Sequence, residues 1–167
     1  MKKNIIIGLT AIVICLMSAA CSNNTGDPEI ESQLDGTWKA THTETEYEDG
    51  VAIRMKATET VSYDAKTHKM HSVINMRMTS PISIDFCTIT VDGTWSADVN
   101  SLSENYDRSS VKFDFNTGLL DREDREEFKS EMLSDFENKS VCEIRAIETD
   151  RIVVYDGEDE LTYHRKQ

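Results

Sequence analysis

The sequence contains histidine, serine and carboxylate groups, but their spacing does not match a catalytic site. His68 and His71 have the spacing of metal ligands on a helix, yet they fall at a predicted turn into a strand, where the two rings point to opposite faces. The acidic run Asp156–Glu160 lacks the ligand alternation of a calcium loop. The chain has no Gly-x-Ser-x-Gly elbow, Cys-His motif or glycine-rich phosphate loop. We therefore predict no enzymatic activity, no metal site and no cofactor.

Glu59 is the carboxylate with the most unusual predicted surroundings. From Val51 to Tyr63 apolar and polar residues alternate, and Glu59 falls on the apolar side of that pattern. A lone carboxylate is costly to bury without a partner. Three interpretations remain open: Glu59 pairs with a basic group on the last strand, points at a ligand, or lies in solvent near an end of the fold.

Cys87 and Cys142 form a candidate disulfide. An even pair of cysteines in an exported chain is typical of such a bond, which here would close a loop worth roughly 4 kcal/mol in chain entropy. The alternative is two buried free thiols that pack as small apolar side chains. We predict the bond.

The N-terminus predicts export. Lys2 and Lys3 precede the apolar run Ile5–Met17, and the small residues Ser18-Ala19-Ala20 follow it, which is the order of a secretory signal peptide. The apolar run is shorter than the roughly 20 residues that a membrane-spanning helix needs. A cysteine, Cys21, stands directly after the small residues.

The segment ending at Cys21 resembles the lipobox of bacterial lipoproteins, with Ser18 in place of the usual leucine, a relaxed form similar to that of Bacteroidota. The resemblance implies cleavage before Cys21 and acylation of its thiol, which anchors the chain in the outer membrane. Residues 21–33 would form a flexible tether, in which Asp27, Glu29 and Glu31 loosely resemble a surface-export signal. The predicted divisions are a signal peptide (1–20), the lipidated cysteine and tether (21–33) and a folded domain (34–167).

The sequence of the folded domain predicts short strands joined by tight turns. Asp49-Gly50 separates Trp38–Glu46 from Val51–Tyr63 and is typical of a hairpin. We therefore predict an antiparallel up-and-down β-barrel of about eight or nine strands. The other predicted strands are His68–Met78, Ile82–Val91, Thr94–Val99, Leu102–Tyr106, Val111–Phe115, Val141–Glu148, Arg151–Tyr155 and Glu160–Arg165.

One segment has helical spacing. In Asp121–Glu137 the residues Phe128, Met132, Leu133 and Phe136 recur on one face, and Asp121 suits the N-cap. This predicts one helix inserted before the last three strands. We expect it to lay its apolar stripe on the barrel as a structural plug.

The motif Gly36-Thr37-Trp38 at the first strand resembles the Gly-x-Trp signature of lipocalins. It recurs as Gly93-Thr94-Trp95, where glycine permits a sharp bend and tryptophan fills a barrel end. With the lipobox, the chain is similar to small lipocalin-like lipoproteins of Bacteroidota. The resemblance implies that Arg165 on the last strand packs over Trp38, and that one small ligand binds inside the barrel.

The resemblance and the period-two pattern together give a set of candidate ligand-binding residues. Flexible thioethers suit an adaptable apolar pocket, although the same stripe is more ordinarily packed core. The candidates are Met55, Glu59, Val61, Tyr63, Met70, Met76, Met78 and Phe113.

Charge limits the partners. Cleavage before Cys21 would leave 16 basic and 31 acidic side chains, which excludes nucleic acid as a partner. The leading hypothesis is a cell-envelope lipoprotein whose barrel binds a small apolar or amphipathic ligand, with the membrane contacted through the lipid. The alternative is a packed barrel that contacts an envelope protein or glycan, or inhibits a partner, through its outer surface.

Overall fold

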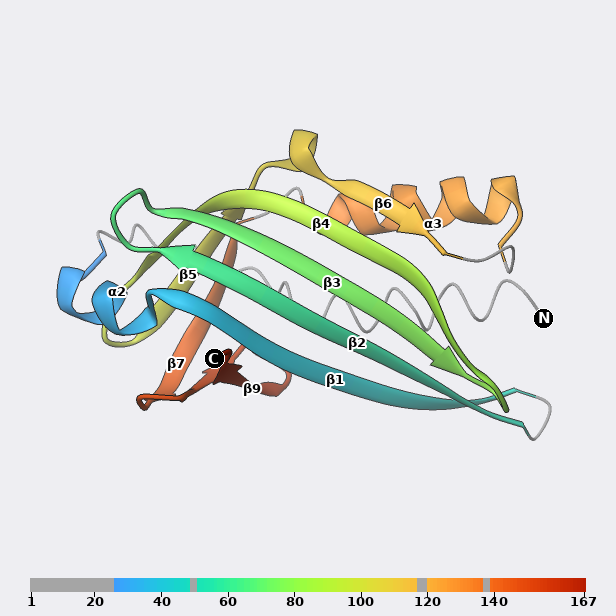
Figure 1. Ribbon diagram of the computed structural model, residues 1–167, viewed down its shortest axis with the longest axis horizontal. Coiled ribbons are helices and arrows are strands. Elements are labelled where there is room, and N and C mark those ends of the chain that lie inside the picture. The colour runs from blue at the N-terminus through green and yellow to red at the C-terminus, as the bar shows by residue number, and fades with distance from the viewer. Residues whose placement is uncertain (1–25, 49–50, 117–119, 137–138) are drawn as a thin grey trace.

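The computed structural model describes residues 26–48, 51–116, 120–136 and 139–167. The predicted signal peptide and Cys21 lie outside the described residues. Nine antiparallel strands form one sheet, and the pairing of β3 with β4 closes eight of them into a barrel, with β6 as an extra strand beside β4 (Figure 1). The strands are β1 (Gly36–Glu48), β2 (Val51–Asp64), β3 (Lys69–Thr79), β4 (Ser83–Ala97), β5 (Ser101–Tyr106), β6 (Lys112–Phe115), β7 (Ser140–Ile147), β8 (Arg151–Tyr155) and β9 (Glu160–Arg165).

In the described ranges, two α-helices and one 3₁₀ turn accompany the strands. They are α2 (Pro28–Leu34), α3 (Arg122–Asp135) and η1 (Arg108–Ser110). The helix α3 precedes the last three strands, as predicted, and the side chain of Asp121 accepts a hydrogen bond from the backbone N–H of Asp124 at 3.0 Å. The predicted barrel and the predicted N-cap are therefore both confirmed.

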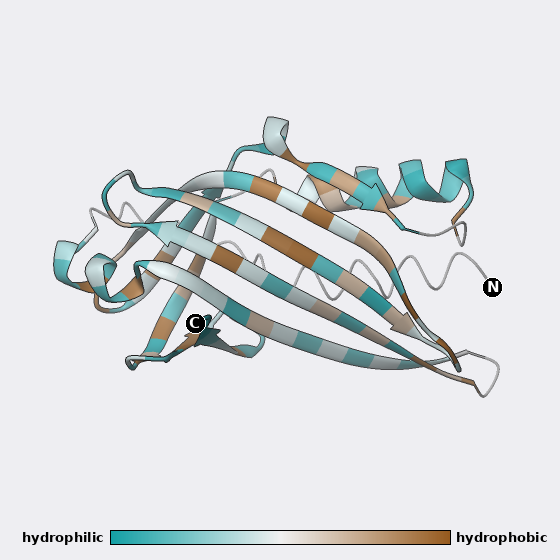
Figure 2. Ribbon diagram, in the orientation of Figure 1, coloured by the Kyte–Doolittle hydropathy of each residue, from teal (hydrophilic) through white to brown (hydrophobic). Residues whose placement is uncertain are grey.

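The long strands follow the period-two pattern of the sequence. β2 pairs with β1 from Tyr63↔Gly36 to Val51↔Glu48. Its residues from Ile53 onward alternate between buried and more exposed positions. Figure 2 shows the alternation as bands of brown and teal along the strands. One face of each long strand therefore enters the core while the other meets solvent.

Where we predicted two strands, the chain forms the single strand β4. We expected Gly93 to bend the chain sharply into a new strand after Val91, but β4 runs without interruption from Ser83 to Ala97. A Cβ at position 93 would lie 2.6 Å from the carbonyl oxygen of Asn105 on β5. Glycine is therefore required here for the close approach of two backbones, and not for a turn.

The flexible tether predicted over residues 21–33 is wrong in its C-terminal part. Pro28–Leu34 forms α2, with Asp27 as its N-cap. The backbone N–H of Asp27 donates to the carbonyl of Ala97 at 2.7 Å, and Glu31 is 3% exposed. An N-cap followed by proline starts a helix efficiently, and Leu34 anchors this one in the core.

The predicted contact between Arg165 and Trp38 is confirmed at the α2 end of the barrel. Trp38 is fully buried, and the guanidinium of Arg165 lies 4.1 Å from the ring centroid. Arg165 also donates to the carbonyls of Gln33 and Asp35 at 2.6 and 2.7 Å. Gly36 has φ +120°, and a Cβ there would lie 2.8 Å from Nη1 of Arg165. Glycine is therefore required by both conformation and space.

The helix α3 lies towards the opposite end of the barrel from α2 (Figure 1). Its residues Phe128, Met132 and Phe136 are at most 1% exposed, as expected of a plug. The ring of Phe128 packs against Phe86 and Phe115, with centroids 6.0 and 5.9 Å apart. None of the helices in the described part of the chain is long and apolar enough to cross a membrane.

Candidate functional site

Two carboxylates lie buried inside the barrel. Glu59 on β2 is 4% exposed, and Glu104 on β5 is 7% exposed. Glu59 accepts hydrogen bonds from Ser72 Oγ and Tyr163 OH, both at 2.6 Å. Glu104 accepts from Tyr63 OH at 2.5 Å and from Tyr106 OH at 2.7 Å. We call these six residues the acid–tyrosine network.

Strand geometry brings the network together. Glu59 and Tyr63 are four residues apart on β2, and Glu104 and Tyr106 are two apart on β5, so each pair points to the same side of its strand. Ser72 on β3 and Tyr163 on β9 complete the group. Each of the two carboxylates therefore accepts two hydrogen bonds from the hydroxyl groups of neutral side chains.

Burial dominates the electrostatics of the network. It raises the pKa of Glu104 from 4.5 to about 7, and the negative charge of Glu59 adds to the rise while the hydroxyls of Tyr63 and Tyr106 oppose it. Burial likewise raises the pKa of Glu59, against the hydrogen bonds of Ser72 and Tyr163. The pKa of each tyrosine is raised well above its ordinary value, first by burial and next by a neighbouring carboxylate. The tyrosines are therefore neutral donors, and Glu104 changes protonation near neutral pH.

The predictions for Glu59 are partly corrected. It does not lie in solvent, because it is buried. Its partner does come from the last strand, as one interpretation required, but that partner is the hydroxyl of Tyr163 and not a basic group. A hydroxyl satisfies a buried carboxylate without neutralising it, which is why burial still raises the pKa of Glu59.

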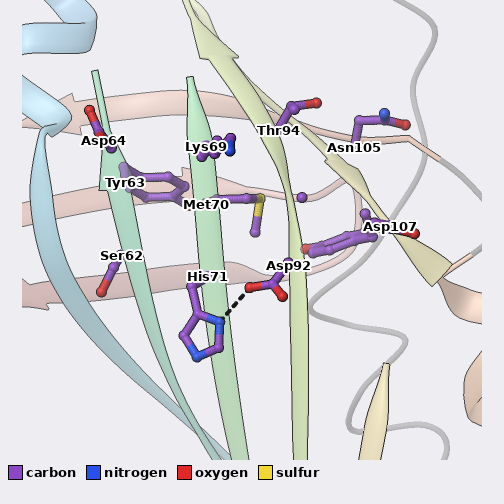
Figure 3. A pocket seen from close by; sticks show the side chains of 12 residues that line it. Ser62, Tyr63, Asp64, Lys69, Met70, His71, Asp92, Thr94, Asn105 and Asp107 are labelled. Carbon is purple, nitrogen blue, oxygen red and sulfur yellow. Dashed lines mark hydrogen bonds and ion pairs between the residues drawn. The ribbon is translucent and has the colours of Figure 1, made fainter. Parts of the chain in front are cut away.

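A hollow of about 650 Å³ opens on the outer surface near the α2 end (Figure 3). Most of its lining residues face outward, and Nδ1 of His71 lies 2.7 Å from Oδ1 of Asp92, its partner on the neighbouring strand. Tyr63 and Tyr106, which donate to Glu104, also line it. The lining residues are Ser62, Tyr63, Asp64, Lys69, Met70, His71, Asp92, Gly93, Thr94, Asn105, Tyr106 and Asp107.

Most of the predicted ligand-binding residues do not line this hollow. Met55, Val61 and Met76 are at most 1% exposed and belong to the hydrophobic core. Met78 and Phe113 are partly buried, and Phe113 packs on Phe128 with ring centroids 6.2 Å apart. Of the eight candidates, only Tyr63 and Met70 line the hollow. The methionine stripe is therefore packed core.

The predicted disulfide is not formed. Cys87 and Cys142 are free and buried, and burial raises the pKa of both thiols to about 12. Cys87 lies on β4 and Cys142 on β7, with β5 between these strands in the sheet. Two steps across a sheet amount to roughly 10 Å, beyond the reach of a disulfide. The alternation within each strand can be predicted from the sequence, whereas the order of the strands around the barrel cannot.

Sequence reasoning missed Ser72, Glu104, Tyr106 and Tyr163. The signal for Glu104 and Tyr106 was present, because Leu102, Glu104 and Tyr106 share one side of a strand, as Glu59 and Val61 do. Nothing in the spacing indicates that β2, β5 and β9 meet at these side chains.

No metal-ligand set is gathered among the described side chains, since no three His, Cys, Asp or Glu residues come together in them. No protein-family model matches the sequence, and no curated protein is similar to it.

Proposed function

We propose that this chain is a lipid-anchored protein of a bacterial cell envelope, and that its packed barrel is a binding module that acts through its outer surface. The N-terminal sequence supports the first part, since charged, apolar and small residues precede Cys21 in the order of a lipoprotein signal. A proposed relatedness to lipocalin-like lipoproteins of Bacteroidota is supported by that segment and by the contact between Trp38 and Arg165.

The packing of the interior is the observation that favours a binding site on the outer surface of the barrel. The methionine stripe belongs to the hydrophobic core, and the aromatic residues of α3 are buried against residues of β4, β5 and β6. A ligand of the usual size needs a pocket of about 300–1,000 Å³. The outer hollow has that volume, whereas the side chains of Met55 and Val61 are fully buried in the core.

The chemistry of the hollow favours a hydroxyl-rich ligand such as a glycan. Asp64, Asp92 and Asp107 present carboxylates that accept hydrogen bonds from hydroxyl groups, and Lys69 and Asn105 present donors. Tyr63 and Tyr106 turn into the barrel, at 5% and 8% exposure, and so offer no broad aromatic face to an apolar ligand. Hydrogen bonding would therefore dominate recognition.

Binding is tested by titrating the full chain in detergent with soluble envelope glycan fragments, with calorimetry as the readout. We expect the variant H71A/N105A to bind about tenfold more weakly. The matched control is N75A/T88A, which removes a hydrogen-bonded outward pair on β3 and β4 but leaves the hollow intact. Equal affinity of both variants would contradict the role of the hollow. Native mass spectrometry that finds a co-purified molecule extractable into organic solvent would instead support a ligand inside the barrel.

Lipid anchoring is tested separately by growing the producing cells with an alkyne-bearing fatty acid. The chain should become labelled, and Cys21→Ala should abolish the label. Cys15→Ala, within the predicted signal peptide, should retain it. Labelling that survives Cys21→Ala would overturn the anchor.

A further inference from the structure

Within the part of the chain that the structure describes, one backbone edge of β1 has no neighbouring strand over most of its length. On one side β1 pairs with β2 throughout, but on the other side β9 pairs only with Trp38 and Lys39. From Ala40 to Tyr47 this second edge is hydrogen-bonded to no strand among the described residues, and Figure 1 shows β1 continuing well past β9. We call Ala40–Tyr47 the open edge.

The open edge is long enough to accommodate a complete strand. At about 3.3 Å per residue it extends for roughly 26 Å, whereas a typical strand is about 17–20 Å long. Alternate N–H and C=O groups along such an edge point outward without a strand partner, and such a row is a template for pairing with another chain.

Two rows of side chains flank the open edge. His42, Glu44 and Glu46 face the concave side and are partly buried, whereas Thr41, Thr43 and Thr45 are exposed on the outer face. Across the sheet, Glu44 pairs with Met55 and Glu46 with Ile53, so β2 offers these two carboxylates no cation. His42 lies 3.4 Å from Glu44. The concave row is therefore acidic and the outer row is neutral.

We propose that the open edge accepts one added strand from another protein, an extended segment with Lys or Arg at alternate positions and β-branched residues between them. Alternate side chains of an added strand would lie beside Glu44 and Glu46, and the others would lie beside Thr43 and Thr45. Opposite charges side by side stabilise strand pairing, and threonine packs well against β-branched neighbours. Backbone hydrogen bonds supply affinity and the alternate charges supply selectivity.

A second copy of the same strand is a poor occupant. Pairing of two open edges would place Glu44 and Glu46 among the carboxylates of the other copy, and like charges at neighbouring positions destabilise a sheet. The acidic row would thus reject the chain's own edge while attracting a basic one. This surface lies on β1, apart from the hollow on β2–β5, so it is independent of the proposed glycan site.

The test uses the full chain in detergent and a fluorescent peptide of about ten residues in which lysine alternates with threonine or valine. Fluorescence anisotropy reports binding. A second peptide with the same sequence carries N-methyl groups on alternate amides, which removes the donors of one edge and keeps the charge. We expect N-methylation to weaken binding about tenfold and a peptide with glutamate in place of lysine to bind no better than the N-methylated one. Hydrogen exchange should slow in Ala40–Tyr47.

The matched variants separate strand addition from general attraction to an acidic protein. E44K/E46K should lose about tenfold in affinity for the lysine peptide. E158K/D159K changes the net charge equally at an exposed turn between β8 and β9 and should bind normally. If charge reversal disturbs folding, E44Q/E46Q replaces E44K/E46K in this test, because it removes the two negative charges without reversing them. Equal binding of the N-methylated peptide, protection outside the open edge, or dimers of the chain paired through β1 would overturn the proposal.

Discussion

Glu104 makes stability depend on pH. Its pKa rises from 4.5 to about 7 on folding, which corresponds to about 3 kcal/mol. Between these values the unfolded chain has lost the proton and the folded chain still holds it, so the contribution of Glu104 to stability is largest below pH 4.5 and falls until pH 7. We expect Glu104→Gln, which keeps the shape and removes the charge, to raise the free energy of unfolding by about 1–3 kcal/mol at pH 8 and to reduce the pH dependence.

The measurement is urea unfolding at pH 5 and at pH 8. Glu158→Gln is the matched control, since Glu158 is exposed at a turn, and it should leave both values unchanged. A Glu104→Gln protein that is less stable at pH 8 than the parent would show that the tyrosine hydrogen bonds matter more than the buried charge.

At the scale of elements, much of the fold could be predicted because the information is local. β8 and β9 have the predicted bounds, since both flank the turn Asp156–Asp159, and α3 begins after its predicted N-cap, Asp121. The acid–tyrosine network could not be predicted in full, because Glu104, Tyr106 and Tyr163 meet Glu59 and Tyr63 only after the barrel closes. The two-residue alternation along a strand shows on which face of the sheet a side chain lies, but it does not show which other strand lies opposite.

The helix α3 should contribute strongly to stability through Phe128. Its ring is fully buried among three other phenylalanines, Phe86, Phe113 and Phe115. Phe128→Ala should cost about 3–5 kcal/mol because it leaves a cavity. Glu127→Ala, an exposed neighbour on the same helix, should change stability by less than about 0.5 kcal/mol. Urea unfolding of both variants tests this, and a small loss for Phe128→Ala would mean that α3 is dispensable for the core.

At the scale of the molecule, the barrel holds without a covalent link between its two buried thiols. Cys87 and Cys142 should resist a thiol reagent in the folded state, because burial raises the pKa of each to about 12 and blocks access. After denaturation both should react, and a reductant should leave the melting temperature unchanged. Mass spectrometry of the alkylated chain counts the free thiols. A chain in which neither cysteine is labelled, and whose mass is two hydrogens below that of the reduced chain, would show that the disulfide forms after all.

Closure of the barrel depends on a narrow seam between β1 and β9. Only Trp38↔Arg165 and Lys39↔His164 pair there, and Lys166 adds one backbone hydrogen bond to Thr37. Arg165 reinforces the seam, because its planar guanidinium stacks on Trp38 and donates to the carbonyls of Gln33, Asp35 and Thr149. Lysine keeps the positive charge of arginine, but it lacks the planar guanidinium group and its set of N–H donors. Arg165→Lys should therefore cost about 1–3 kcal/mol.

The loss in Arg165→Lys should be local as well as global. Hydrogen exchange should quicken at the amides of Lys39 and Lys166, which lie in the seam, more than at amides in the centre of the β2–β3 pairing, because opening the seam frees β9 before the long strands separate. Arg145→Lys is the control, since Arg145 also stacks on an aromatic ring, that of Tyr155, but lies on β7 away from the seam. A uniform increase in exchange across all strands of Arg165→Lys would show that the barrel opens as a single unit, and that the short β1–β9 pairing is not its weakest point.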